Sequence, residues 1–141
     1  MKLASTNALY ANDVITKRVT DYATEHSLPL PKHITDFHEW VVKNHARSDY
    51  MISVNQSQSN VFLSRMIGAK RVLEIGTFVG YSALVWAHAI GQEGKVTTLE
   101  FSPEYAGIAR DTFKKNGVDN VEVVEGDALE TFVNLQCIQY F

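Results

Sequence analysis

The chain has few of the residues that small proteins use for covalent or metal cross-links. Its 141 residues include a single cysteine, Cys137, which excludes an intramolecular disulfide and a cysteine-rich zinc site. No apolar run approaches the roughly 18 residues that a membrane span requires, and the N-terminus lacks the apolar core of a secretory signal peptide. These absences predict a cytoplasmic protein without a membrane partner.

A mitochondrial location is the alternative to the cytoplasm. Lys2, Lys17 and Arg18 stand among Ser and Thr residues near the N-terminus, as they would in a basic transit peptide. Asp13 and Asp21 lie in the same stretch and weaken this interpretation, because transit peptides contain few acidic residues.

An excess of charge of one sign is also absent. The formal net charge is −3, and the Lys and Arg residues are scattered among acidic ones. Because no basic stripe is available for phosphate backbones, nucleic acid is not an expected partner. The 45% hydrophobic and 21% charged residues are typical of a globular protein. We therefore expect one domain, residues 1–141, that binds a small molecule.

The spacing of apolar residues changes near Gly68. Before it, residues 1–68 show helical spacing, and after it, residues 69–141 alternate between strand and helix patterns, as parallel α/β units do. A polar stretch, Ser53 to Asn60, precedes the third helical pattern, which Gly68 can end. The predicted helices cover residues 7–26, 34–46, 61–67, 80–90 and 103–115, with a further helix starting near Leu129. The predicted strands are 71–75, 96–100 and 121–124.

The first predicted strand runs into a glycine turn and then a helix, over the residues Val72 to Ser82. Gly76 and Gly80 let the chain turn sharply and let backbone N–H groups approach a bound group closely. The following helix N-terminus adds donors and a partial positive charge. In an open α/β sheet, ligands bind beside such a loop at the carboxyl ends of the strands.

Two acidic residues end the next two strands. Glu100 lies 20 residues after Gly80, where an acid in such folds accepts hydrogen bonds from both ribose hydroxyls. Asp127 follows the third strand and can accept from an adenine amino group, while Ala128 leaves room for the ring. Taken singly, Glu100 could be a solvated acid and Asp127 a helix cap, but three strand ends that agree predict a nucleoside site.

Glu74 is unusual because it interrupts an otherwise apolar strand. Burial of a carboxylate is costly unless the group is paired, so this position suggests a role in binding. A dinucleotide such as NAD is the rival ligand, but its fingerprint is G-x-G-x-x-G, whereas the two glycines here are Gly76 and Gly80. A carboxylate beside the loop would also repel a pyrophosphate.

A zinc site is not expected from the histidines. His38 and Glu39 begin like H-E-x-x-H, but the motif would need a second His at position 42, which is Val42.

The run Leu73-Glu74-Ile75-Gly76-Thr77-Phe78-Val79-Gly80-Tyr81-Ser82 resembles the cofactor motif of the cation-dependent caffeoyl-CoA and catechol O-methyltransferases in their small bacterial and fungal form. The segment Met51 to Gln58 is also similar to the one that precedes the third helix in that family, with Ser57 where glycine is usual. The resemblance implies a Rossmann-like class I methyltransferase fold that binds S-adenosylmethionine and releases S-adenosylhomocysteine. The cofactor-binding residues that it implies are Met51, Ser53, Glu74, Gly76, Thr77, Gly80, Tyr81, Ser82, Glu100, Asp127 and Ala128.

In that family the methyl acceptor is a catechol-like hydroxyl compound, and residues after a fourth strand bind a divalent cation such as Mg²⁺. No counterpart of those residues follows Ala128, so the resemblance implies neither a catalytic nor a metal-binding residue in this chain. Three interpretations stay open: an O-methyltransferase seen in shortened form, a cofactor-binding module without catalysis, and a regulatory variant that pairs with a full-length homologue.

The family's strand order adds an expectation about assembly. The first strand is central there, between the second strand and the missing fourth. Residues 71–75 would therefore lack a neighbour on one side, and an apolar strand edge of this kind associates. We expect a homodimer that covers it.

Overall fold

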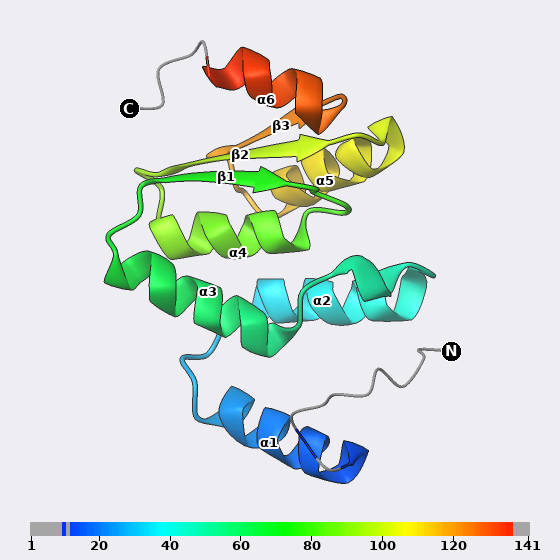
Figure 1. The fold of residues 1–141 in the computed structure, drawn as a ribbon, viewed down its shortest axis with the longest axis vertical. Coiled ribbons are helices and arrows are strands. Elements are labelled where there is room, and N and C mark those ends of the chain that lie inside the picture. The colour runs from blue at the N-terminus through cyan, green and yellow to red at the C-terminus, as the bar shows by residue number, and fades with distance from the viewer. Residues whose placement is uncertain (1–9, 11, 137–141) are drawn as a thin grey trace.

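The chain begins with helices and continues as an α/β unit (Figure 1). The computed structural model describes residue 10 and residues 12–136, with side chains described as far as Val133. No helix in this part of the chain is long and apolar enough to cross a membrane. In chain order the elements are α1 (Asp13–Glu25), α2 (Lys32–Asn44), the 3-10 turn η1 (Ser48–Tyr50), α3 (Val54–Met66), β1 (Arg71–Ile75), α4 (Tyr81–Ile90), β2 (Lys95–Glu100), α5 (Pro103–Lys115), β3 (Val121–Glu125) and α6 (Ala128–Gln136).

The three strands form one parallel sheet in the order β1-β2-β3. Val96 of β2 is the register partner of Val72 on one side and of Val121 on the other. β2 is central, and every residue after Lys95 in it is buried. Within the described residues β1 is an edge strand, as the family resemblance predicted.

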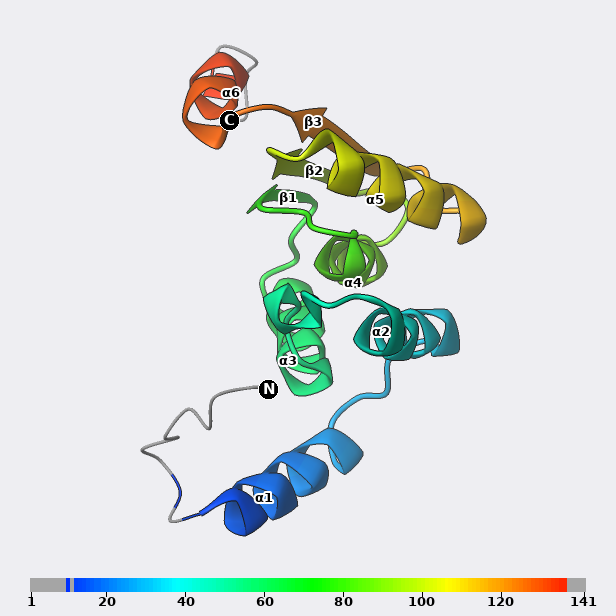
Figure 2. The ribbon, with the colours of Figure 1, turned by 90° about the vertical axis from the view of Figure 1, so that its right-hand side faces the viewer.

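Helices cover the two faces of the sheet unequally. α4 and α5 lie on one face and α6 on the other, and α2 and α3 pack on the far side of α4 (Figures 1 and 2). α4 is apolar around most of its circumference and is therefore the centre of the core. α1 lies farthest from the sheet.

Local signals explain where the best-predicted elements begin and end. Ser102 caps α5 by accepting a hydrogen bond from the backbone N–H of Tyr105, and Pro103 takes the first helical position, which needs no N–H. Gly91 ends α4 at a positive φ of 73°. β1 and α5 have the predicted bounds. α4, β2 and β3 differ from prediction by one residue at one end, and α2 begins and ends two residues earlier than predicted.

The prediction of a helix over residues 7–26 was wrong in its start. Asn12 is the N-cap of α1, and its side chain accepts a hydrogen bond from the N–H of Ile15, so helical backbone begins at Asp13. Residues 7–9 and 11 lie outside the described part of the chain. None of the residues of α1 is buried, so the predicted apolar face of this helix, with Val19 and Tyr22, stays half-exposed or exposed.

The polar stretch is helical from Val54 onwards, contrary to prediction. Ser53 and Gln56 form a capping box, in which each side chain bonds the other residue's backbone N–H, so α3 begins at Val54. The stretch lacks apolar periodicity because two of its buried residues, Ser57 and Gln58, are polar. At the other end of the chain, α6 confirms a helix near Leu129, but Cys137 and the rest of the predicted tail helix lie outside the described residues.

Candidate cofactor-binding site

Gly76 and Gly80 serve different purposes in the loop between β1 and α4. Both have a positive φ, 89° and 92°, which side-chain-bearing residues rarely adopt. A Cβ on Gly80 would lie 2.9 Å from two ring carbons of Phe113, so this glycine allows α4 and α5 to approach closely. A Cβ on Gly76 would meet nothing within 4 Å. Gly76 therefore leaves open space beside the loop.

Five of the eleven predicted site residues line one cavity under this loop. Tyr50 and Phe78, which the sequence analysis missed, complete the lining. The cavity measures about 30 Å³, far below the roughly 300–1,000 Å³ of a small-molecule site. It would enclose only one end of a ligand, and the rest would lie along the open strand ends. The predicted residues in the lining are Met51, Gly76, Thr77, Tyr81 and Ser82.

Glu74 does not line this cavity, and its carboxylate is held by neutral donors. The indole N–H of Trp86 donates to Oε1 at 2.9 Å, and the Thr98 hydroxyl donates to Oε2 at 2.7 Å. The Ser82 hydroxyl is a third hydrogen-bond partner. Burial raises the pKa of Glu74, and the three hydrogen bonds oppose that rise. The carboxylate therefore keeps an unfavourable buried charge that a positively charged group would stabilise.

A chain of hydroxyl groups connects Glu74 with the loop. Thr77 Oγ1 lies 2.6 Å from Thr98 Oγ1. Because the single hydroxyl proton of Thr98 goes to Glu74, Thr77 must donate to Thr98. The orientation of the Thr77 side chain thus depends on the acid in β1.

The Glu100 carboxylate is turned into the loop. Oε2 accepts hydrogen bonds from the backbone N–H groups of Thr77 (3.0 Å) and Phe78 (2.7 Å), and Oε1 accepts from the N–H of Ser102 (2.9 Å). A carboxylate has about four acceptor positions, so three are already filled. The predicted contact of Glu100 with both ribose hydroxyls needs two acceptor positions. One of these three hydrogen bonds would therefore have to be given up.

The remaining predicted residues do not line the cavity. The end of β3 is beside Glu100, since the Gly126 N–H donates to the Glu100 carbonyl at 2.9 Å. Asp127 is exposed, and its Oδ1 accepts from the N–H of Leu129 at 2.8 Å, as a helix cap does. Ala128 follows it in the first turn of α6. Ser53 is occupied by the capping box of α3.

Ser57, at the position where the related family has glycine, bonds to a site residue. Its Oγ lies 2.9 Å from the Ser53 carbonyl and 3.0 Å from the hydroxyl of Tyr81. One hydroxyl proton cannot serve both oxygens, so Tyr81 donates to Ser57 when Ser57 donates to Ser53. The serine thereby anchors the first residue of α4 to α3.

Phe78 is the centre of an aromatic cluster at the mouth of the cavity. Its φ of 51° makes it the one non-glycine residue with positive φ in the described part of the chain. Its ring contacts those of His45, Tyr50 and Tyr105 at centroid distances of 5.9, 5.7 and 4.8 Å. Its place between the two glycines was the available signal in the sequence.

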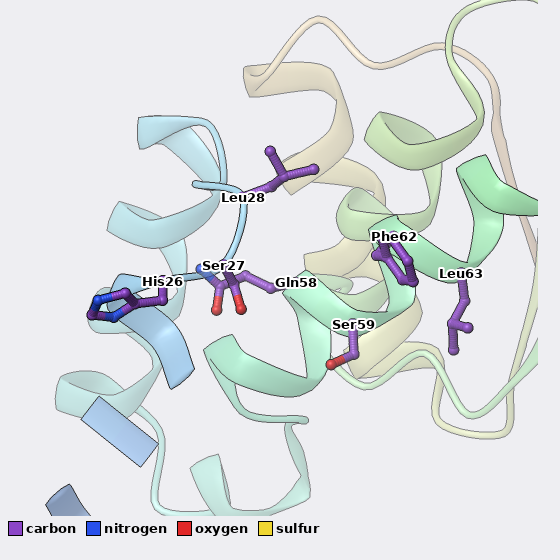
Figure 3. Close-up of a pocket in the computed structure, with 7 residues that line it drawn as sticks. All are labelled: His26, Ser27, Leu28, Gln58, Ser59, Phe62 and Leu63. Atoms are coloured by element: carbon purple, nitrogen blue, oxygen red, sulfur yellow. The ribbon is translucent and has the colours of Figure 1, made fainter. Parts of the chain in front are cut away.

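A larger groove of about 600 Å³ lies elsewhere, between the C-terminal end of α1 and α3 (Figure 3). Gln58 reaches from α3 towards α1 and donates to the Thr24 carbonyl at 3.0 Å. None of the predicted site residues lines this groove. It is lined by His26, Ser27, Leu28, Gln58, Ser59, Phe62 and Leu63.

Comparison with known proteins agrees with this geometry. A family model described as O-methyltransferase matches residues 24–139. The chain is 38% identical over 123 residues to O-methyltransferase ankF of Aspergillus thermomutatus, which covers 84% of this chain and 51% of that protein. It is 44% identical over 85 residues to the catechol O-methyltransferase of Mycobacterium tuberculosis, covering 60% and 39% of the two chains.

Solved structures show the same fold. The SAH-bound methyltransferase PaMTH1 of Podospora anserina superposes with a TM-score of 0.82 at 35% identity, over 86% of this chain and 53% of that one. The O-methyltransferase from Bacillus cereus in complex with SAH gives 0.72 at 30% identity, over 87% and 56%. This chain thus spans about half the length of these proteins. With its three parallel strands and their helices it has a Rossmann-like methyltransferase fold, and it belongs to the O-methyltransferase family.

Proposed function

We propose that this chain binds S-adenosylmethionine and S-adenosylhomocysteine at the glycine loop, as the cofactor-binding part of an O-methyltransferase acting on a hydroxyl of a catechol-like small molecule. The observation that carries the proposal is the half-buried carboxylate of Glu74, whose described hydrogen-bond donors are all neutral and include Ser82 of the cavity lining. The methionine part of S-adenosylmethionine brings two positive charges, on its ammonium and its sulfonium.

The residues present fit this ligand. The open space beside Gly76 lets the ligand approach the loop closely. Met51, Thr77 and Ser82 line the cavity that would take the amino acid end of the ligand. Glu100, Asp127 and Ala128 are arranged along the ends of β2 and β3, where the ribose and adenine would lie. When bound, S-adenosylmethionine supplies an activated methyl group. The neighbours PaMTH1 and the Bacillus cereus enzyme, each with SAH bound, support this assignment.

A divalent cation does not fit the residues described. Among residue 10 and residues 12–136, no group of three or more His, Cys, Asp or Glu side chains could hold a metal ion. The residues that position the methyl acceptor would belong to the part of the family fold that this chain does not span. If the reaction uses a cation such as Mg²⁺, its ligands would belong to that part as well. The alternative is a chain that binds cofactor but has a regulatory rather than a catalytic role.

Calorimetric titration with S-adenosylhomocysteine and NAD side by side tests the ligand class. We expect binding of S-adenosylhomocysteine and no measurable heat from NAD, because the spacing of Gly76 and Gly80 does not suit a pyrophosphate. NAD binding of equal strength, or no binding of S-adenosylhomocysteine, would refute the proposal.

In a parallel assay with catechol and Mg²⁺ we expect no methyl transfer by residues 1–141 alone. Turnover there would show that the acceptor site is complete.

A homodimer through β1 is the second part of the proposal. Leu73 and Ile75 are 40% and 66% exposed and face away from α4, because Glu74 between them bonds Trp86 of α4. They lie on the face of the sheet that carries α6, where Leu129 is also exposed. A second copy that pairs along this edge would satisfy the backbone groups on the outer side of β1 and bring its own apolar side chains beside Leu73 and Ile75.

Light scattering should give the mass of a dimer for the wild type. Leu73→Lys should give a monomer, because a charge on an edge strand opposes pairing. Ile67→Lys, at the exposed apolar residue that follows the end of α3, is the matched control and should stay dimeric. A wild-type monomer would contradict the proposal, and co-purification with a longer homologue would favour the regulatory alternative.

A cytoplasmic location stays a prediction, which cell fractionation tests.

A further inference from the structure

We propose that Glu100 is a positioning residue, whose carboxylate holds the glycine loop in its binding conformation before any ligand arrives. The effect of this role on cofactor binding rests on the proposed function. The hydrogen bonds by which Glu100 holds the loop are present in the ligand-free protein and do not depend on that function. It adds a second role to the ribose contact that the family resemblance implies.

The geometry of the contact supports a structural hold on the loop. Glu100 is 8% exposed, and one of its oxygens, Oε2, receives the consecutive N–H groups of Thr77 and Phe78. Hydrogen bonds to an ionised carboxylate are roughly twice as strong as neutral ones. The other oxygen is fixed by the N–H of Ser102, so the carboxylate is itself held in place.

The loop needs such a hold because Phe78 has an unfavourable backbone conformation. Its φ of 51° lies in the left-handed region, which costs a bulky residue free energy. The N–H of Phe78 makes the shorter of the two bonds to Oε2, at 2.7 Å. Without it, the residue would be free to relax towards a negative φ and to change the shape of the cavity that it lines with Thr77.

The neighbouring strand supplies a comparison within the same chain. Glu125 is the register partner of Glu100 and likewise ends its strand. Its carboxylate is paired with Arg110 of α5, and that pair is about half-exposed. Position at a strand end is therefore not enough to make an acid hold the loop, and Glu125 can serve as the control.

Amide hydrogen exchange by NMR in the ligand-free chain tests the hold directly. In Glu100→Gln the N–H groups of Thr77 and Phe78 should exchange several-fold faster than in the wild type. In Glu100→Ala they should exchange at least about tenfold faster, because hydrogen bonds to a charged group are lost. The Val96 amide, which bonds the Asn120 carbonyl within the sheet, should be unaffected. Glu125→Gln should leave all three amides unchanged.

Unchanged exchange at Thr77 and Phe78 would overturn the proposal. So would an equal rise at Val96, because the substitution would then act only by loosening the whole sheet. Glu100→Gln has the same size as the native residue and keeps the test valid if Glu100→Ala fails to fold. None of these results depends on cofactor binding, so failure here is distinct from failure of the proposed function.

Ligand affinity then separates the two roles of Glu100. S-adenosylhomocysteine and its 2′,3′-dideoxy analogue would be titrated into the wild type and into Glu100→Ala. If the loop is held by Glu100, the substitution should lower affinity for both ligands, by at least about tenfold for the parent compound. Loss confined to the parent compound would mean that Glu100 contacts the ribose alone and would overturn the positioning role.

Discussion

Replacing Gly80 by alanine should lower the free energy of unfolding by clearly more than the same replacement at Gly76. Both residues have a φ near 90°, so each alanine would carry a similar strain, on the order of 1–2 kcal/mol. Only at Gly80 would the new Cβ also collide with the ring of Phe113, 2.9 Å away, and overpacking of this kind costs about 1–3 kcal/mol more.

Chemical denaturation of the two variants beside the wild type measures the difference. Because the backbone strain is common to both, the gap between them isolates the contact of α4 with α5. Equal losses would mean that Phe113 moves aside without cost. Gly76→Ala should instead weaken S-adenosylhomocysteine binding, since its methyl group would extend into the open space beside the loop.

Glu74→Gln should weaken binding of S-adenosylmethionine at least about tenfold at neutral pH and remove most of the pH dependence of binding. In the wild type, burial raises the pKa of Glu74 above its ordinary value of 4.5. A positively charged ligand favours the ionised carboxylate, so binding releases a proton. Wild-type affinity should therefore rise as pH rises towards the raised pKa of the free protein and then level off above it.

Unfolding of the ligand-free protein should show the opposite trend. The folded state holds the Glu74 proton more tightly than the unfolded state does, so its contribution to stability is complete below pH 4.5 and is lost as pH rises through the raised pKa. Glu74→Gln should lack this loss. Glu122→Gln, at an exposed acid paired with Lys95, is the control for general charge effects. An affinity of Glu74→Gln that follows pH as the wild type does would exclude Glu74 as the titrating group.

The elements that sequence predicts best are those with strong local signals at both ends. The pair Ser102-Pro103 starts α5 and Asn116 ends it, and the apolar run of β1 is followed by Gly76, so the bounds of both were correct. The predicted start of α3 lies too far along the sequence, because the first half of this helix is polar. Ser57 and Gln58 are buried there because Tyr81 and Thr24, distant in the sequence, bond to them.

Five of the eleven predicted site residues line one cavity, but the contacts that the predicted acids make could not be read from the sequence. Sequence spacing placed an acid at the end of β2, but it carries no information on whether the Glu100 side chain turns towards a ligand or into the loop. Likewise, Glu74 was recognised as costly to bury, whereas its partners Trp86 and Thr98 depend on how α4 and β2 pack. The place of Phe78 between two glycines put it in the loop, but its residue type gave no sign of a positive φ, because phenylalanine rarely adopts one.

The order of the strands bears on how the chain folds. β1, β2 and β3 pair in the order in which they are synthesised, and each pairing needs one intervening helix and no strand from further along. Contacts between segments close in sequence form quickly, because little loop entropy is lost. The sheet can therefore grow one βα unit at a time as the polypeptide leaves the ribosome. Within the described residues, β1 has no strand neighbour on its outer side, so this is the edge at which another strand can join the sheet.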